Sequence, residues 1–186
     1  MFEYSTEAVV LDKEPIGESD ALVFLYTPGY GKVVARAKSA RKITSKLAAS
    51  LEPANIVSAR VLSYGTYQIA DAVSLERGAS WRSTPESLRA LLHFLRSIKE
   101  LAPEGEPLHG IWDELRVVFS EPPRSLAKSY KILLRSAGFD ARNARCEGCH
   151  TMKPDYFIPS EALFICKACR RGDVRDAEHI ALVFQS

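Results

Sequence analysis

Four cysteines constrain the fold of this chain more than any other feature of its sequence. They form two pairs, each with two residues between its members, and 16 residues separate the pairs: Cys146, Cys149, Cys166 and Cys169. Two intervening residues allow one tight turn to present both thiolates to a metal ion, and Zn²⁺ prefers four such ligands in a tetrahedron. The spacing therefore predicts one structural zinc ion, with no open position for water or substrate. Between the pairs, the apolar segments 156–158 and 163–165 flank Pro159-Ser160, which predicts a short hairpin that returns the second pair to the first.

Two alternatives remain open for these cysteines. They would form two disulfides in an exported protein, and His150, next to Cys149, allows coordination by three cysteines and one histidine. However, the N-terminus has acidic residues where a signal peptide needs a basic flank. No apolar run reaches the roughly 18 residues of a membrane span. We therefore expect a cytoplasmic protein with no membrane partner, in which reduced thiols bind a metal.

The hydrophobic period changes near residue 80, which predicts a β domain followed by helices. Five short segments rich in β-branched and aromatic residues predict strands: residues 7–11, 21–26, 32–37, 56–64 and 67–73. Five such strands are typical of a small barrel, and an open sheet is the alternative. A capping box at Ser83-Thr84-Pro85-Glu86 then predicts a helix start, and two further helices follow Pro107 and begin near Ser125.

These patterns predict an α+β protein with four parts. Residues 1–80 form the five-stranded barrel and residues 81–142 a helical bundle. Residues 143–173 form the zinc-binding module, and residues 174–186 form a C-terminal helix that packs on the bundle.

Two basic clusters lie within a chain whose net charge is only +2. The first contains no acidic residue and covers the third predicted strand and the loop after it: Lys32, Arg36, Lys38, Arg41, Lys42 and Lys46. Such rows of cations attract phosphate backbones, and nearby tyrosines can stack on bases. The candidate stacking residues are Tyr26, Tyr30, Tyr64 and Tyr67. We favour nucleic-acid binding here over a solvated loop.

The second basic cluster is spaced for one face of the helix that begins near Ser125: Arg124, Lys128, Lys131 and Arg135. A solvated helix face explains it as well as a site for DNA or an acidic peptide does.

No enzymatic motif accompanies these features. The sequence lacks the GxxxxGK[ST], GxSxG and HExxH patterns, and its four histidines form no recognisable catalytic set. We expect a protein without catalytic activity. A nucleic-acid-binding protein of this kind could be an RNA-binding or ribosome-associated protein with a barrel and a zinc ribbon.

Several segments share their order and spacing with a known family. They are EAVVL (7–11), IGESD (16–20), TPGYGK (27–32), AKSARK (37–42) and LEP (51–53), followed by Leu134-x₃-Gly138-Phe139 before the first cysteine pair. The set resembles RecO, the bacterial recombination mediator and DNA repair family. Ser39 stands where that family commonly has glycine, and the sequence ends at Ser186 where typical members continue.

The resemblance implies an N-terminal OB-fold, a helical bundle and a zinc-binding module. It also implies binding of single- and double-stranded DNA, annealing of complementary strands, and action with RecR to load RecA onto DNA coated by single-strand-binding protein, in the cytoplasm and at the nucleoid. It assigns the first basic cluster to the DNA-binding surface of the OB-fold and the four cysteines to zinc.

Overall fold

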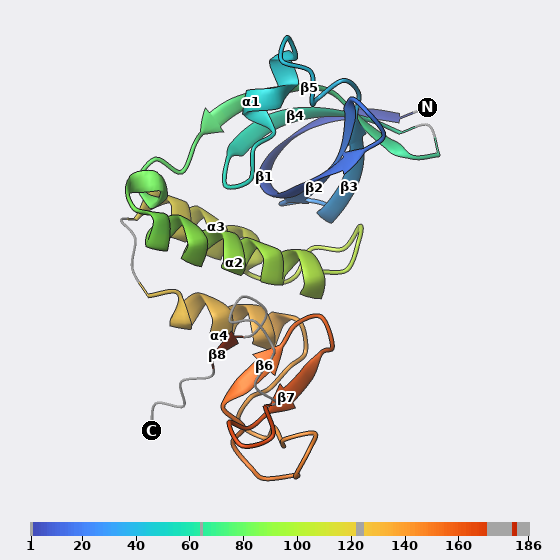
Figure 1. Cartoon of the computed structure of the whole chain (residues 1–186). Helices are drawn as coiled ribbons and strands as arrows, with labels where there is room; N and C mark the ends of the chain where they lie inside the picture. Colours follow the sequence, from blue (N-terminus) through green and yellow to red (C-terminus); the bar gives the residue numbers. More distant parts are fainter. Residues whose placement is uncertain (1, 64, 122–124, 171–179, 182–186) are drawn as a thin grey trace. The chain divides into compact units, whose positions relative to one another are not determined.

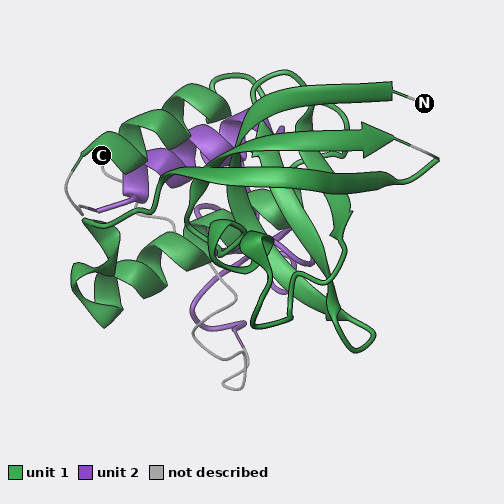
Figure 2. Ribbon diagram, turned by 90° about the horizontal axis from the view of Figure 1, so that it is seen from above, with its two compact units in different colours: residues 1–123 green, residues 124–186 purple. Residues whose placement is uncertain are grey.

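The computed structural model describes residues 2–63, 65–121, 125–170 and 180–181, and the chain divides into two compact units. Unit 1 comprises residues 1–123 and unit 2 residues 124–186 (Figure 2). Among the described residues, none of the helices combines the length and the apolar character that crossing a bilayer requires.

Unit 1 begins with a closed five-stranded barrel (Figure 1). Its strands are β1 (Phe2–Ile16), β2 (Asp20–Thr27), β3 (Gly31–Ala37), β4 (Ile56–Ser63) and β5 (Tyr67–Glu76), and they close in the order β1-β2-β3-β5-β4. All neighbouring pairs are antiparallel except β3 and β5, which form a short parallel pair where Ala35 lies opposite Tyr67. The predicted barrel is confirmed, and the open sheet is excluded.

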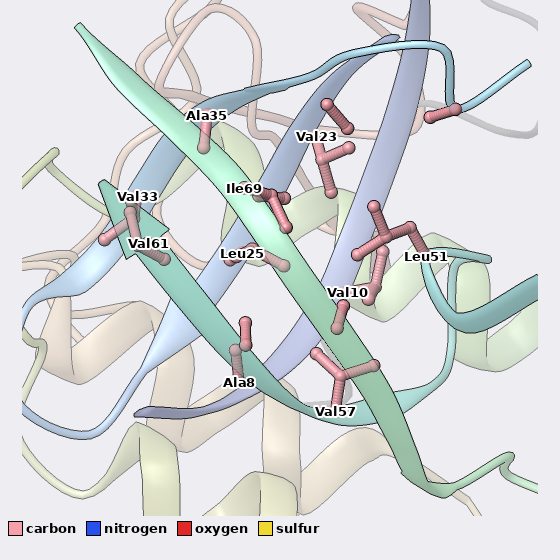
Figure 3. Close-up of a cluster of buried hydrophobic side chains, with 14 of the residues drawn as sticks. Ala8, Val10, Val23, Leu25, Val33, Ala35, Leu51, Val57, Val61 and Ile69 are labelled. Carbon is pink, nitrogen blue, oxygen red and sulfur yellow. The ribbon is translucent and has the colours of Figure 1, made fainter. Parts of the chain in front are cut away.

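Alternation along the strands decides which side chains fill the barrel. In β3, Val33, Ala35 and Ala37 are buried, whereas Lys32, Val34 and Arg36, at the alternate positions, are not. Successive side chains of a strand point to opposite faces, so one register buries the apolar set and leaves the basic set outside. Aliphatic side chains from all five strands meet inside the barrel (Figure 3).

Two longer helices follow the barrel within unit 1. The short helix α1 (Lys46–Ser50) joins β3 to β4, and a 3₁₀ turn, η1 (Trp81–Ser83), precedes α2 (Pro85–Leu101) and α3 (Ile111–Ser120). Helix α2 packs against β1. This explains why β1 carries a continuous buried run from Ala8 to Leu11 instead of an alternating one. The buried Trp81 indole donates to the Val118 carbonyl at 2.8 Å, which ties η1 to α3.

The start of α2 differs from the predicted capping box by one residue. Thr84, not Ser83, is the N-cap, and its side chain accepts a hydrogen bond from the Ser87 N–H at 3.1 Å. The reason is Pro85, because the residue before a proline is forced into an extended conformation, which an N-cap also adopts. Thr84 is extended, whereas Ser83 lies in the 3₁₀ turn.

Unit 2 contains α4 (Ala127–Ser136) and a small sheet in the order β7-β6-β8. Its strands are β6 (Tyr156–Ile158), β7 (Leu163–Ile165) and β8 (Ile180–Ala181). The hairpin of β6 and β7 is the one that the sequence predicts between the cysteine pairs. Phe157 lies in a ring cluster of this unit, with centroids 4.8 Å from both Phe139 and Phe164.

The structure differs from two predictions about the C-terminal half of the chain. Ile180 and Ala181 pair with β6, so the predicted C-terminal helix is wrong at these residues, and the other positions from 174 to 186 lie outside the described residues. The second edge of β6 offers free backbone groups that a strand can satisfy. The compact units also place α4 with the cysteine segment, whereas the predicted bundle of residues 81–142 joins it to α2 and α3.

Candidate metal centre and nucleic-acid interface

The hairpin of β6 and β7 brings the two cysteine pairs together. The sulfur atoms of Cys146, Cys149, Cys166 and Cys169 all lie within 4.8 Å of one another. Cys149 and Cys166 have their sulfur atoms 3.6 Å apart. Tetrahedral zinc with Zn–S bonds of about 2.3 Å would hold its sulfur ligands about 3.8 Å apart. The arrangement could therefore hold a metal ion of this size.

The two pairs lie in turns of the same design. The His150 N–H donates to the Cys146 carbonyl at 2.8 Å, and the Arg170 N–H donates to the Cys166 carbonyl at 3.0 Å. In each turn the N–H of the fifth residue thus donates a hydrogen bond to the carbonyl of the first. Gly148 fits closely in the first turn, because a Cβ there would lie 3.1 Å from the Cys169 sulfur.

Backbone N–H groups and neighbouring thiols push the pKa values of these cysteines in opposite directions. Burial raises the pKa of Cys146, but the N–H groups of Cys166, Cys149 and Gly148 outweigh it and lower this pKa to about 6. Hydrogen bonds with the Cys149 and Cys166 side chains, together with burial, raise the pKa of Cys169 to about 12. Four thiolates so close together repel one another unless a cation lies among them, so the donor set suits a divalent ion.

The alternatives for the cysteines gain no support from this geometry. None of the four cysteines forms a disulfide. His150 is exposed, and in the described part of the chain the group of possible ligands consists of the four cysteines without it.

Lys32 does not share the surroundings of the rest of the first basic cluster. Its ammonium group donates to the Lys99 carbonyl at 2.8 Å, and the Gly105 N–H donates to the Lys32 carbonyl at 2.9 Å. Lys99 itself lies over the Phe24 ring, 4.0 Å from its centroid. The C-terminal end of α2 and the segment after it therefore cover this part of β2 and β3, and Lys32 is half-buried there.

Arg36 and Arg41 bind protein groups and so build the loop after β3. Arg36 forms an ion pair with Asp20, with Nη2 2.5 Å and Nε 2.8 Å from Oδ2. Arg41 donates from Nη1 to the Gly17 carbonyl at 2.9 Å, and its N–H donates to the Ser19 carbonyl at 2.9 Å. Both arginines thereby connect the loop to the turn between β1 and β2.

Asp20 is the centre of this connection. Its Oδ1 accepts the Ser39 N–H at 2.7 Å. This hydrogen bond and the Arg36 guanidinium hold the pKa of Asp20 below its usual range. Ser39 has a positive φ of 54°, a conformation that favours glycine and that the bond to Asp20 helps to stabilise. Glycine adopts this conformation without strain, which is consistent with the glycine that the resemblance implies at this position.

Three lysines of the first basic cluster remain exposed and have no acidic partner among the residues that the structure describes: Lys38, Lys42 and Lys46. We refer to residues 38–46 as the basic loop. It is the part of the predicted surface whose ammonium groups are available to a ligand.

An aromatic cluster lies on the same barrel, and the sequence pattern predicted only half of it. Tyr4 is the central residue, with its ring centroid 4.6 Å from that of Tyr30 and 5.5 Å from that of Phe2. Burial, Tyr67 and Tyr30 raise the pKa of Tyr4 to about 12. Phe2, Tyr30 and Tyr67 are exposed. Phe2 and Tyr4 are two residues apart, a spacing that puts both on one face of a strand and that could have identified them.

The other two candidate stacking tyrosines are not part of this cluster. Tyr26 is buried, and its hydroxyl accepts the Leu108 N–H at 2.9 Å and donates to the Leu108 carbonyl at 3.3 Å. It therefore has a structural role. Tyr64 lies outside the described residues.

The second basic cluster lies on one exposed face of α4, as its spacing predicts. Lys128, Lys131 and Arg135 are exposed, whereas Leu133 and Leu134 of the same helix are buried. Arg124 lies outside the described residues.

Comparison with known proteins identifies relatives whose sequences align with most of this chain. Residues 1–74 match the family model described as "Recombination protein O N terminal". Proteins named "DNA repair protein RecO" from Dehalococcoides mccartyi and Bifidobacterium longum are each 27% identical to this chain over 92% of its length, and the matches cover 72% and 76% of those proteins. One from Thermodesulfovibrio yellowstonii is 28% identical over 89% of this chain and 70% of its own.

Proposed function

We propose that this chain, which belongs to the RecO family, is a DNA-binding recombination mediator that binds DNA through its N-terminal barrel. The observation that carries the proposal is the basic loop. Its three exposed lysines lack acidic partners among the described residues, while the neighbouring arginines hold the loop in place. An ammonium group without an internal partner is free to replace the counterions of a phosphate backbone.

The aromatic cluster complements these charges. Tyr67 lies opposite Ala35 in the β3–β5 pair, one residue before Gln68, which lies opposite Arg36. Exposed tyrosine rings stack on unpaired bases, which single-stranded DNA offers and duplex DNA does not. We therefore assign phosphate contacts to Lys38, Lys42 and Lys46, and base contacts to Tyr30 and Tyr67.

The exposed lysines of the basic loop would also favour annealing. Two complementary strands repel each other through their phosphates, and a protein that neutralises part of this charge favours their encounter. As the family resemblance implies, we propose that the chain anneals strands and acts with RecR to load RecA onto DNA coated by single-strand-binding protein. Lys128, Lys131 and Arg135 of α4 are a candidate contact for DNA or for an acidic partner segment.

The cysteine group would hold one structural zinc ion, which would neutralise the thiolate charge and cross-link the two turns. Cys146 and Cys149 hold it from the first turn, and Cys166 and Cys169 from the second. The four sulfur ligands leave no open position, so this site has a role in folding rather than in chemistry.

The test is the salt dependence of binding to a single-stranded oligonucleotide. Changing Lys38, Lys42 and Lys46 together to alanine should weaken binding and reduce the slope of log K against log salt by roughly 0.7 for each phosphate that the variant no longer neutralises. A matched control removes three exposed cations elsewhere in unit 1, with Arg77, Arg89 and Arg96 changed to alanine. Equal slopes for the two variants would place the binding site outside the basic loop.

An RNA oligonucleotide of the same sequence separates this function from the RNA-binding alternative. A recombination mediator should anneal complementary DNA strands. Tight RNA binding without any DNA annealing would contradict the proposed function.

A further inference from the structure

Ile43 has an exposure that needs an explanation. Its relative exposure is 103%, whereas no other large apolar side chain in the described part of the chain exceeds the 57% of Val73. Single apolar residues on a surface are common, but the other large ones in the described part of the chain keep part of their surface covered. Ile43 instead projects from the basic loop, and none of the described residues covers it.

The loop that carries Ile43 is anchored on both sides. Before it, Ala40 is buried in the barrel core, and after it Leu47 packs against the same core. The Lys42 N–H donates to the Ser39 carbonyl at 3.1 Å, and the Ser45 N–H donates to the Lys42 carbonyl at 2.9 Å. Ile43 therefore occupies the first central position of a hydrogen-bonded turn, residues 42–45.

The contacts of Asp20 and Arg41 strengthen this anchoring. They fix the base of the loop to the turn between β1 and β2, so the tip extends from a braced support. A side chain held in this way can insert into a ligand at a low entropy cost, because the backbone that carries it is already ordered.

The charges around Ile43 indicate what this ligand is. Arg41, Lys42 and Lys46 surround it in the sequence, and no acidic residue occurs between Lys38 and Leu51. Asp20 reaches the base of the loop, but Arg36 and the Ser39 N–H already occupy its carboxylate. An apolar tip among cations matches nucleic acid, which presents apolar base faces between rows of phosphates.

We propose that Ile43 is a wedge that inserts between neighbouring bases while Lys42 and Lys46 hold the flanking phosphates. The proposal rests on the DNA binding proposed above and adds a residue and a preferred substrate. Apolar side chains of DNA-binding proteins unstack base steps in this way. Unstacking costs least where a base is already unpaired on one side, so the preferred substrate is a junction between single- and double-stranded DNA.

The test uses the full chain and a junction substrate with 2-aminopurine at the last paired position. The fluorescence of 2-aminopurine rises when the base is unstacked. At saturating wild-type protein the signal should rise. Ile43→Thr keeps the β-branched shape but adds a hydroxyl group, and it should reduce the rise by about 3-fold or more while the affinity changes less than that. Leu75→Thr, an exposed apolar residue of β5, is the control and should behave as wild type.

Each of the other outcomes contradicts the proposal that Ile43 inserts between bases, and each does so in a different way. If wild type and Ile43→Thr bind the junction and give equal fluorescence, the wedge is wrong and the proposed function stands. If the wild type does not bind DNA at all, both are wrong. If Ile43→Thr leaves the fluorescence unchanged but loses binding to an acidic peptide with an apolar end, the loop is a protein-docking site.

Discussion

The barrel of unit 1 and the cysteine segment of unit 2 reach a folded state by different means. The barrel encloses a continuous apolar core to which all five strands contribute, and the helix after it covers β1. The cysteine segment has two three-residue strands of a hairpin, a cluster of phenylalanine rings, and four clustered cysteines that can all be thiolates only when a cation lies among them.

This difference shows how a short segment can fold without a large core. A domain needs enough buried apolar surface to offset the conformational entropy that it loses, and small domains often use a metal for this. In unit 1 stability is distributed over many side chains. In the cysteine segment it is concentrated in one site, so we expect the two regions to respond very differently to single changes.

The largest expected effect is the loss of the metal. Cys166→Ser should unfold the segment of residues 146–169 and leave the barrel folded, because bound zinc contributes on the order of 10 kcal/mol to folding in zinc-finger peptides. Metal analysis of the wild type should give one zinc per chain, and hydrogen exchange should show reduced protection in unit 2 alone. Ser160→Ala, in the turn between β6 and β7, is the control. Retained protection in Cys166→Ser would contradict a structural metal.

A core substitution in the barrel should have the next largest effect. Leu25 is fully buried inside the barrel, and Leu25→Ala should destabilise unit 1 by about 2–5 kcal/mol, because apolar burial is removed and a cavity is left behind. Denaturant titration measures this change. Leu75→Ala removes the same side chain from an exposed position of β5 and should cost far less. Equal effects would show that the barrel interior is not the main source of stability.

The Asp20 contacts should respond to pH. The pKa of Asp20 in the folded chain is lowered by the Ser39 N–H and by Arg36. Its contribution to stability is therefore complete above the unfolded-state pKa, about 4, and is lost as the pH falls through the lowered folded-state value.

In Asp20→Asn this pH dependence should disappear. The basic loop should also exchange its amide hydrogens faster at neutral pH. Glu18→Gln, on the same turn, removes a carboxylate that forms none of these contacts and is the control. A stability profile between about pH 2 and pH 5 that matches wild type in Asp20→Asn would show that Asp20 does not brace the loop.

The smallest expected effect concerns the second basic cluster. Changing Lys128, Lys131 and Arg135 together to alanine should alter DNA affinity less than the triple change in the basic loop, because a charged helix face is often only solvated. Titration of single-stranded DNA and of an acidic peptide against both variants gives the comparison. A larger loss of DNA binding from α4 than from the basic loop would transfer the main site to unit 2.

The sequence by itself determined the features that depend on local spacing. Short stretches of sequence were enough to recognise the spacing of the four cysteines, the alternation in β3, the five strands and the hairpin between the cysteine pairs. The resemblance to a family likewise rests on short segments that occur in a fixed order. Turn chemistry and strand pleat act over a few residues, so they can be recognised without knowing the fold.

Only the tertiary structure decided which of the candidate side chains are available to bind a ligand. Lys32 and Tyr26 look equivalent to their neighbours in the sequence, but Lys99 and Leu108, far along the chain, occupy their polar groups. Phe2 and Tyr4 became part of a cluster only when the barrel closed beside Tyr30. Burial and hydrogen bonding depend on partners distant in sequence, and no local pattern of residues contains that information.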